Sequence, residues 1–231
     1  MLYLINPENY HMHREDLDNM YRLRHAVFYE KMKWHVSSKN GLEKDEFDEN
    51  NMYYILYKDE AGIIRGCVRF IEMTNKCMFD GPFKFALPTL EDFKNPNYWE
   101  LSRLVVDHNY DTRYTAELAR YISLNLVSGY LFFSLQLKNI ECTLVVAYPS
   151  TYKLYVSYGL LFTEINRVIF DDKIKEQIVI AAFPSLNYCY DKMITKMGID
   201  KTLPVLWHLE AKFNRLQPAH SQKSKINTRR L

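Results

Sequence analysis

Apolar and polar positions in the first third of the chain follow first a helical and then a strand periodicity. From Arg14 to Lys33, apolar side chains recur every three or four residues, which predicts an amphipathic helix. Residues 52–58 and Ile63 to Met73 are rich in aromatic and β-branched residues, and Asp59-Glu60-Ala61-Gly62 between them is typical of a turn. The pattern therefore predicts a helix followed by a β-hairpin.

Beyond a loop-rich stretch over 74–97, the chain predicts strands that alternate with helices. Strands are expected near 98–107 and over 141–148, 162–170 and 177–183; helices are expected over 114–137, from Pro149 onward and over 185–197. Antiparallel strands followed by strands that alternate with helices indicate the α/β class. We expect a three-layer α/β/α sandwich around a mixed central sheet.

Length and composition fit one large domain. The chain has 231 residues, of which 48% are hydrophobic and 15% aromatic, enough for a substantial core. The last 18 residues, from Asn214 to Leu231, contain five basic and no acidic side chains. We therefore expect a single domain over 1–213 and a basic, flexible tail over 214–231.

Charge and cysteine content exclude several classes of protein. The net charge is only +2, and no basic recognition helix is visible, so nucleic acid is not an expected partner. The four cysteines lie in no pattern typical of a zinc site or a disulfide framework. We find no signal peptide and no apolar stretch long enough to span a bilayer, so we expect a cytoplasmic protein without membrane insertion.

Charged and aromatic residues recur in short motifs along the first 107 residues. Taken singly, each has an ordinary explanation as a surface charge or a core aromatic residue. Together they are more specific, because several spaced motifs arrive in a fixed order. They are Arg24-His25-Ala26-Val27-Phe28, Trp34, Glu43-Lys44-Asp45-Glu46-Phe47-Asp48, Gly66-Cys67-Val68-Arg69, Met78 with Phe83, and Trp99-Glu100-Leu101-Ser102-Arg103.

This order resembles that of the acyl-homoserine lactone synthases, the LuxI-type autoinducer synthases of bacterial quorum sensing. Their pattern reads R-x-x-V-F, W, E-x-D-x-[FY]-D, G-C-x-R, M-x-x-x-x-F and W-E-L-S-R, and the match covers roughly residues 15 to 107. There are two departures. Lys33 stands where the family often has glycine, and Phe70 to Thr74 stand where it usually continues toward L-P-T. Both concern local loop shape.

The resemblance implies an N-acetyltransferase-like version of the fold and a two-step reaction. The amine of S-adenosylmethionine attacks an acyl thioester to form an amide. The methionyl carboxylate then attacks its own γ-carbon, closes the lactone and expels methylthioadenosine. S-adenosylmethionine is a substrate here, and no metal or redox cofactor is expected.

Substrate chemistry suggests roles for the motif residues. A sulfonium cation favours aromatic faces, which suits Phe28 and Trp34. The carboxylate suits an arginine fork from Arg69 or Arg103, and we assign the ammonium to Asp45. Arginines and acids in balanced numbers can also form a partly buried network. The members of this binding or electrostatic set are Arg24, Phe28, Trp34, Asp45, Asp48, Arg69 and Arg103.

Glu100 is the candidate catalytic base that takes the proton of the attacking amine, through a water molecule. The alternative is that Glu100 only anchors an arginine, since ion-pair networks hold carboxylates without catalysis. Backbone amides around Ser102 to Leu104 are candidate donors to the acyl carbonyl oxygen. Ser102 has no visible His or Asp partner, which argues against a serine hydrolase.

The acyl chain needs an apolar path. The residues assigned to acyl-group binding are Phe83, Ser102, Leu104, Ala147 and Tyr148. Relatives that prefer 3-oxo chains commonly carry a threonine on the strand that ends near Ala147 and Tyr148. Alanine offers no hydroxyl there, so an unsubstituted chain is expected. If the alignment slips, Thr143 takes this position.

The expected acyl donor is an acyl carrier protein, an acidic partner for which Lys138, Lys153, Arg167 or the basic tail are docking candidates. Acyl-coenzyme A is the alternative donor. The competing function is an acetyltransferase-like N-acyltransferase that uses acyl-coenzyme A on another amine. That group usually binds pyrophosphate with a glycine-rich turn before a helix, whereas Asp107 to Glu117 contains no glycine.

Overall fold

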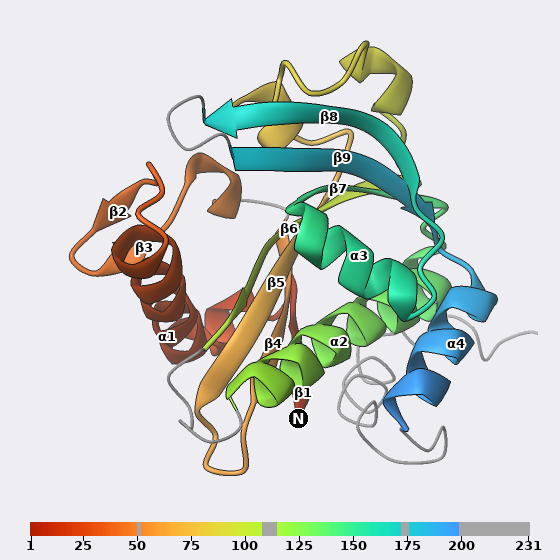
Figure 1. Ribbon diagram of the computed structural model, residues 1–231. Coiled ribbons are helices and arrows are strands. Elements are labelled where there is room, and N and C mark those ends of the chain that lie inside the picture. Colours follow the sequence, from red (N-terminus) through yellow and green to blue (C-terminus); the bar gives the residue numbers. More distant parts are fainter. Residues whose placement is uncertain (50–51, 108–114, 172–175, 199–231) are drawn as a thin grey trace, which may run out of the picture.

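The computed structural model describes residues 1–49, 52–107, 115–171 and 176–198 (Figure 1). Seven strands form one mixed sheet in the order β1-β4-β5-β6-β7-β9-β8, in which β6 and β7 are parallel and every other neighbouring pair is antiparallel. The strands are β1 (Leu2–Ile5), β4 (Met52–Lys58), β5 (Ile64–Glu72), β6 (Tyr98–Val106), β7 (Cys142–Ala147), β8 (Thr163–Asp171) and β9 (Glu176–Pro184). A separate small hairpin pairs β2 (Ser38–Lys39) with β3 (Leu42–Glu43).

Helices cover both faces of the sheet, which gives the predicted three layers (Figure 1). On one face lie α1 (Arg14–Arg24) and its continuation η2 (His25–Lys31), a π-helical segment. On the other lie α2 (Thr115–Phe133), extended by η6 (Ser134–Lys138), then α3 (Pro149–Ser157) and α4 (Asn187–Met197). Four short 3-10 segments occur in the connections: η1 (Tyr10–Met12), η3 (Glu46–Asp48), η4 (Met78–Asp80) and η5 (Leu90–Phe93).

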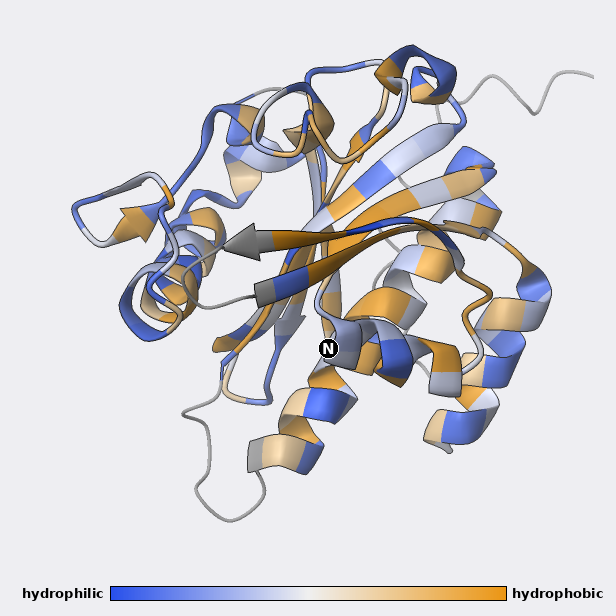
Figure 2. Ribbon diagram, turned by 45° about the horizontal axis from the view of Figure 1, so that its top comes forward, coloured by the Kyte–Doolittle hydropathy of each residue, from blue (hydrophilic) through white to orange (hydrophobic). Residues whose placement is uncertain are grey.

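The sheet separates two apolar cores. One packs sheet residues such as Val68 and Val145 against α2, α3 and α4, and the other packs residues such as Ile71 and Leu144 against α1 and η4. Figure 2 shows hydrophobic residues concentrated along the central strands and hydrophilic residues along the loops. Since successive side chains of a strand point to opposite faces, β5 and β6 contribute to both cores.

The central helix α2 lies very close to β5 at Gly66. A methyl group built there would come within 2.8 Å of Ile122 Cγ2 and 3.0 Å of the Val105 carbonyl oxygen. The stretch from Ala116 to Gln136 has the length and mean hydropathy (1.2) to cross a membrane. The expectation that no apolar stretch is long enough was therefore wrong. Because 61% of that stretch is buried inside the protein, it serves here as a core helix.

The predicted elements are confirmed with small shifts of their ends. The strand β1 was not predicted, since Leu2–Ile5 is too short to show an alternating pattern. The predicted first helix is α-helical only to Arg24 and then widens into the π-helical η2. The basic tail over 214–231 and most of the glycine-free stretch before α2 lie outside the described residues.

A β-bulge in β6 places two consecutive residues on the same face of the sheet. Ser102 pairs with Arg69 and Val105 pairs with Cys67, so Val68 alone lies opposite Arg103 and Leu104. Arg103 is the extra residue, and its φ of 52° lies in the left-handed region. As a result, the side chain of Arg103 joins those of Ser102 and Arg69 on the α1 side.

Lys33, where the resembling family often has glycine, also has a left-handed backbone, with φ of 56°. A side chain costs free energy in this conformation and glycine does not. We predict that Lys33→Gly raises the free energy of unfolding by about 0.5–1 kcal/mol. The control is Lys31→Gly, because Lys31 is exposed but helical; this variant should be destabilised by about 0.5–1 kcal/mol. Urea titration of both variants checks this, and destabilisation by Lys33→Gly would contradict it.

Candidate active site

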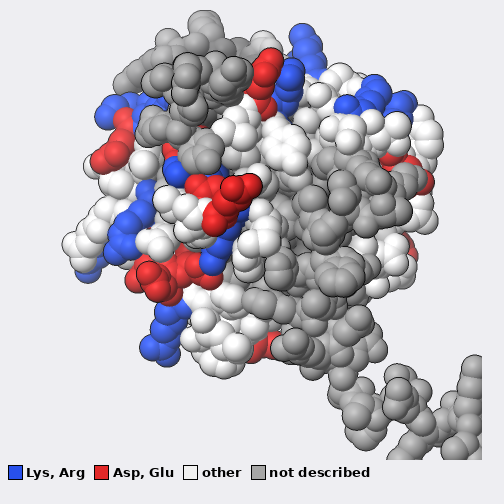
Figure 3. Space-filling view, turned by 90° about the horizontal axis from the view of Figure 1, so that it is seen from below, with Lys and Arg blue, Asp and Glu red and all other residues white. Residues whose placement is uncertain are grey.

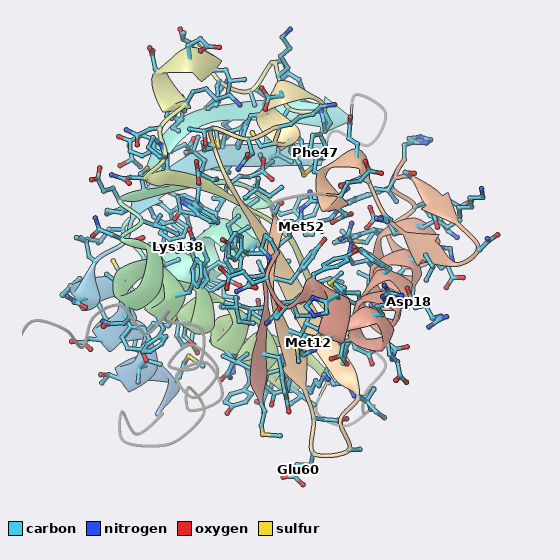
Figure 4. All side chains as sticks on the ribbon, turned by 180° about the vertical axis from the view of Figure 1, so that it is seen from behind. Met12, Asp18, Phe47, Met52, Glu60 and Lys138 are labelled. Carbon is cyan, nitrogen blue, oxygen red and sulfur yellow. The ribbon has the colours of Figure 1, made fainter. Side chains whose placement is uncertain are left out.

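The sequence motifs converge on the α1 side of the sheet. Arg24 ends α1, Arg69 lies in β5 and Arg103 lies in the bulge of β6. Their acidic partners come from a single stretch: Glu43 ends β3, and Asp45 and Asp48 bracket η3. Figure 4 labels Phe47 within this stretch and Met52 at the start of β4. Distant parts of the chain thus meet in one cluster, which we call the arginine–carboxylate network: Arg24, Glu43, Asp45, Asp48, Arg69 and Arg103.

Arg24 is the most completely bonded member of the network. Its Nε donates to Glu43 Oε2 at 2.5 Å, and its Nη1 and Nη2 donate to Asp48 Oδ1 and Oδ2 at 2.9 and 2.8 Å. Arg24, Glu43 and Asp48 are all 0% exposed. A two-pronged arginine–carboxylate pair fixes orientation as well as charge.

Arg69 and Arg103 share Asp45 between them. Arg69 Nη1 donates to Asp45 Oδ1 at 2.6 Å and to Asp48 Oδ1 at 2.8 Å, while Arg103 Nη2 donates to Asp45 Oδ2 at 2.6 Å. Arg103 also donates to Glu43 Oε1 through Nε at 3.2 Å. Both oxygens of Asp45 are therefore bonded to arginines.

The network holds its charges in place. Burial alone would raise the pKa of Asp48, but Arg24 and Arg69 and the bonds they donate hold this pKa well below its ordinary value. The same carboxylates keep the pKa of Arg24 above its ordinary value against desolvation. Three arginines and three acids balance one another, so the cluster can stay ionised although buried.

Glu100 lies beside this network. It is 1% exposed and pairs with Ile71 across β5 and β6, so it is on the same face as Arg69 and Ser102. Its Oε2 accepts a hydrogen bond from the backbone N–H of Met78 at 2.7 Å. Its Oε1 is buried without a hydrogen-bond partner, and Glu100 pairs with no arginine within the described residues. The anchoring alternative therefore has no partner in this structure.

Arg69 carries the second buried polar atom without a partner on this face, its Nη2. The other nitrogens of Arg69 are bonded, Nη1 as above and Nε to Ser102 Oγ at 3.3 Å. Buried polar groups are bonded as a rule, so exceptions need an explanation. One unpartnered carboxylate oxygen and one unpartnered guanidinium nitrogen on one sheet face suit a ligand that carries both a donor and an acceptor.

The predicted aromatic residues adjoin the network. Phe28 and Trp34 stack with ring centroids 4.9 Å apart and planes 3° from parallel. The guanidinium carbon of Arg103 lies 5.7 Å from the Phe28 ring centroid, and the Tyr148 ring lies 5.9 Å from that of Trp34. Phe28 is buried, whereas Trp34 is only partly buried. Trp34 is thus the more accessible ring.

The predicted acyl-binding residues are divided between the two faces. Phe83 and Tyr148 pack against the α1-side core, and Leu104 packs against the α2-side core. Ser102 bonds to Arg69, and Ala147 is partly buried at the end of β7. The pairing of β6 with β7 ends at Leu101 and Val145, although both strands continue. The two groups therefore meet where the sheet loses its pairing.

Sequence reasoning missed the part that three residues play in this site. Glu43 belongs to one of the motifs, but its bonds to Arg24 and Arg103 were not predicted. Met78 gives its N–H to Glu100, and its Sδ accepts from Arg103 Nη1 at 3.4 Å. Tyr54 donates to Asp48 Oδ1 at 2.5 Å. The balance of three arginines against two aspartates was the available signal for Glu43.

Comparison with known proteins decides the family. The model of the autoinducer synthase family matches residues 8–185. The chain belongs to the autoinducer synthase family. An acyl-homoserine-lactone synthase of Aeromonas salmonicida is 35% identical over 97 residues, which are 42% of this chain and 46% of the relative. The match thus spans about half the length of such curated relatives of this family member.

Solved structures of the family share the fold. The acyl-homoserine lactone synthase LasI matches with a TM-score of 0.73 and 22% identity, over 84% of this chain and 94% of that one. BjaI, a CoA-dependent synthase solved with S-adenosylmethionine and isopentyl-CoA, matches with a TM-score of 0.72 and 19% identity, over 91% and 99%. A putative N-acetyltransferase from Lactobacillus plantarum matches with a TM-score of 0.52 and 12% identity, over 80% and 99%. The predicted acetyltransferase-like fold is confirmed.

Proposed function

We propose that this chain makes an N-acyl-homoserine lactone from S-adenosylmethionine and an acyl thioester, with release of methylthioadenosine. The observation that carries the proposal is the pair of unpartnered buried atoms, Glu100 Oε1 and Arg69 Nη2, beside an aromatic pair. An amino acid that also carries a sulfonium ion offers an ammonium, a carboxylate and a cation to these three features. Membership of the autoinducer synthase family supports the same assignment.

Arg69 is the better of the two arginines proposed for the methionyl carboxylate. Its Nη2 is buried and free to donate, whereas the nitrogens of Arg103 already contact Glu43, Asp45 and Met78. The assignment of the ammonium to Asp45 stays a prediction, and in this structure both Asp45 oxygens are bonded to arginines. Glu100 Oε1 offers the ammonium an unoccupied acceptor.

The sulfonium group is assigned to Trp34. Phe28 already contacts both Trp34 and Arg103, and it orients the indole by stacking. Trp34 is partly exposed and has Tyr148 beside it. A cation over an aromatic face gains about 0.5–2 kcal/mol, depending on its desolvation.

In the first step, Glu100 takes a proton from the ammonium, directly or through a water molecule, and the amine then attacks the thioester carbonyl. An amide bond forms, the carbon–sulfur bond of the thioester breaks, and the thiol leaves with a proton. The carbonyl oxygen gains negative charge during the attack. Backbone N–H groups between Ser102 and Leu104, where β6 no longer pairs with β7, are the proposed donors to it.

In the second step, an oxygen of the methionyl carboxylate attacks the γ-carbon. The lactone carbon–oxygen bond forms as the carbon–sulfur bond to the sulfonium breaks, and neutral methylthioadenosine leaves with the electron pair. Arg69 holds the carboxylate on one side, while Trp34 holds the leaving sulfur on the other. The chain's contribution to this step is orientation.

The acyl chain is proposed to pass between β6 and β7 beyond Leu101 and Val145, from the α1 side toward the α2-side core. An unsubstituted chain remains the prediction. Ala147 offers no hydroxyl. Thr143 is 0% exposed, and its hydroxyl lies 2.6 Å from that of Tyr130.

We therefore predict at least about tenfold higher kcat/KM for unsubstituted than for 3-oxo acyl donors, the cost of about one unmade hydrogen bond. Tyr130→Phe should narrow this ratio, because it releases the Thr143 hydroxyl. The control is Tyr152→Phe, which leaves that hydroxyl bonded. Competition between the two donors, followed by mass spectrometry of the products, checks it; a dominant 3-oxo product with the unchanged chain contradicts it.

The proposed acyl donor is an acyl carrier protein, with acyl-coenzyme A as the alternative, and the proposed location is the cytoplasm. On the face seen in Figure 3, basic and acidic side chains lie interspersed among the described residues. Lys138 lies 5.2 Å from the Tyr53 ring centroid and Arg167 is bonded to Glu164, so Lys153 is the docking candidate with no such contact among those three. No nucleic acid and no membrane insertion is proposed.

The test measures thiol release from acyl carrier protein and coenzyme A thioesters of one chain length. We expect release only when S-adenosylmethionine is present, and faster release from the carrier protein. Amines without the sulfonium group, such as methionine and homoserine, serve as controls. Thiol release with other amines but not with S-adenosylmethionine would instead support the acetyltransferase-like alternative.

A further inference from the structure

Tyr54 is buried directly behind the arginine–carboxylate network. It lies in β4 opposite Arg69 of β5, so the two side chains are on the same face of the sheet. It is 0% exposed, and its hydroxyl lies 2.5 Å from Asp48 Oδ1. None of the sequence motifs includes this tyrosine.

The direction of this hydrogen bond follows from the chemistry of the partners. An ionised carboxylate only accepts, so the Tyr54 hydroxyl donates to Asp48. Its oxygen can then accept from the Tyr21 hydroxyl of α1, 3.4 Å away. Burial and the neighbouring Asp48 charge raise the pKa of Tyr54 well above its ordinary value, so the donor keeps its proton.

Asp48 Oδ1 is shared by three donors. These are Arg24 Nη1 at 2.9 Å, Arg69 Nη1 at 2.8 Å and the Tyr54 hydroxyl at 2.5 Å. The Tyr54 bond takes up part of the negative charge that Oδ1 otherwise directs at the arginines. Without it, Oδ1 attracts Arg69 Nη1 more strongly, and this turns the guanidinium away from the side where Nη2 is unpartnered.

We infer that Tyr54 is a positioning residue: through Asp48 Oδ1 it sets the orientation of Arg69 toward the carboxylate of the bound amino-acid substrate. This rests on the proposed function, in which Arg69 Nη2 binds the methionyl carboxylate. Tyr54 itself touches neither substrate. The role concerns affinity for S-adenosylmethionine, and the acyl donor is unaffected.

The test is Tyr54→Phe in the full chain, with steady-state kinetics for both substrates. Phenylalanine keeps the ring, and Asp48 Oδ1 keeps two arginine donors, so no buried acceptor is left unpaired. The loss of one charge-assisted hydrogen bond is expected to raise KM for S-adenosylmethionine about five- to tenfold. KM for the acyl thioester and kcat should stay within about twofold.

The matched control is Tyr21→Phe. Tyr21 is also buried, and it loses its contact with the Tyr54 oxygen while leaving Asp48 untouched. Its KM for S-adenosylmethionine should stay within about twofold of the unchanged chain, since it removes only a long, weak bond. Equal KM changes in the two variants, or a Tyr54→Phe variant with unchanged KM, would overturn the role of Tyr54. Absence of lactone formation by the unchanged chain would instead overturn the proposed function.

If Tyr54→Phe does not fold, the unchanged protein still gives an answer. The hydroxyl protons of Tyr54 and Tyr130 are buried in short hydrogen bonds, so both are accessible to proton nuclear magnetic resonance with labelled tyrosine. Adding S-adenosylmethionine should shift the Tyr54 signal, because the ligand draws on Arg69 and so on Asp48 Oδ1. The Tyr130 signal serves as the internal reference. Binding of S-adenosylmethionine without a shift of the Tyr54 signal would contradict the coupling.

Discussion

Arg24→Ala is expected to lower the free energy of unfolding by about 3–5 kcal/mol, because it breaks a buried ion pair and leaves the partners behind. Arg24 is fully buried and donates three hydrogen bonds to Glu43 and Asp48. Its removal leaves both carboxylates buried with fewer counter-charges. Domains of this size are stable by only about 5–15 kcal/mol, so a large part of the total is lost.

Urea unfolding followed by circular dichroism measures this change. The control is Arg22→Ala, since Arg22 lies two residues earlier in α1, is exposed and contacts only Asn19 through its side chain. It should change the free energy of unfolding by less than about 0.5 kcal/mol. Similar values for the two variants would show that the buried network does not stabilise the fold.

Glu100→Gln is expected to lower kcat by about 10²–10⁴-fold, while KM for S-adenosylmethionine changes only a few-fold. Glutamine keeps an oxygen that can accept from the Met78 N–H, so the local structure should persist. It places an amide nitrogen where Oε1 lies, however, and that group cannot take a proton. Steady-state kinetics and a melting curve together check this.

Glu141→Gln is the control for the loss of a carboxylate. Glu141 is exposed and bonds the Asn97 side-chain amide, which glutamine can still do. Its kinetics should match those of the unchanged chain. If Glu100→Gln loses stability and substrate affinity in proportion to kcat, Glu100 anchors the structure and is not the base.

The layers of the fold and most strands could be predicted from the sequence, because their hydrophobic patterns are long. The strand β1 could not, since its four residues are too few for a pattern. Nor could the bulge in β6. Arginine gives no hint of a left-handed backbone, and Arg103 adopts φ of 52° only because its guanidinium is bonded to Glu43 and Asp45.

The candidate site shows the same division. The motifs brought Arg24, Asp48 and Arg69 to attention, and the structure joins them by hydrogen bonds. Which oxygen or nitrogen stays unpartnered depends on contacts between distant segments, and so does the hydroxyl of Tyr54. Such contacts leave no periodic trace in one sequence. The predicted roles of the site residues remain predictions until activity is measured.

The central claim is that one site acylates S-adenosylmethionine and then closes the lactone. The most direct test quantifies N-acyl-homoserine lactone and methylthioadenosine in the same reaction by mass spectrometry. We predict equal amounts of both at every time point, and little of either with Glu100→Gln. Methylthioadenosine without lactone, or an acylated product that keeps the adenosyl group, would contradict it.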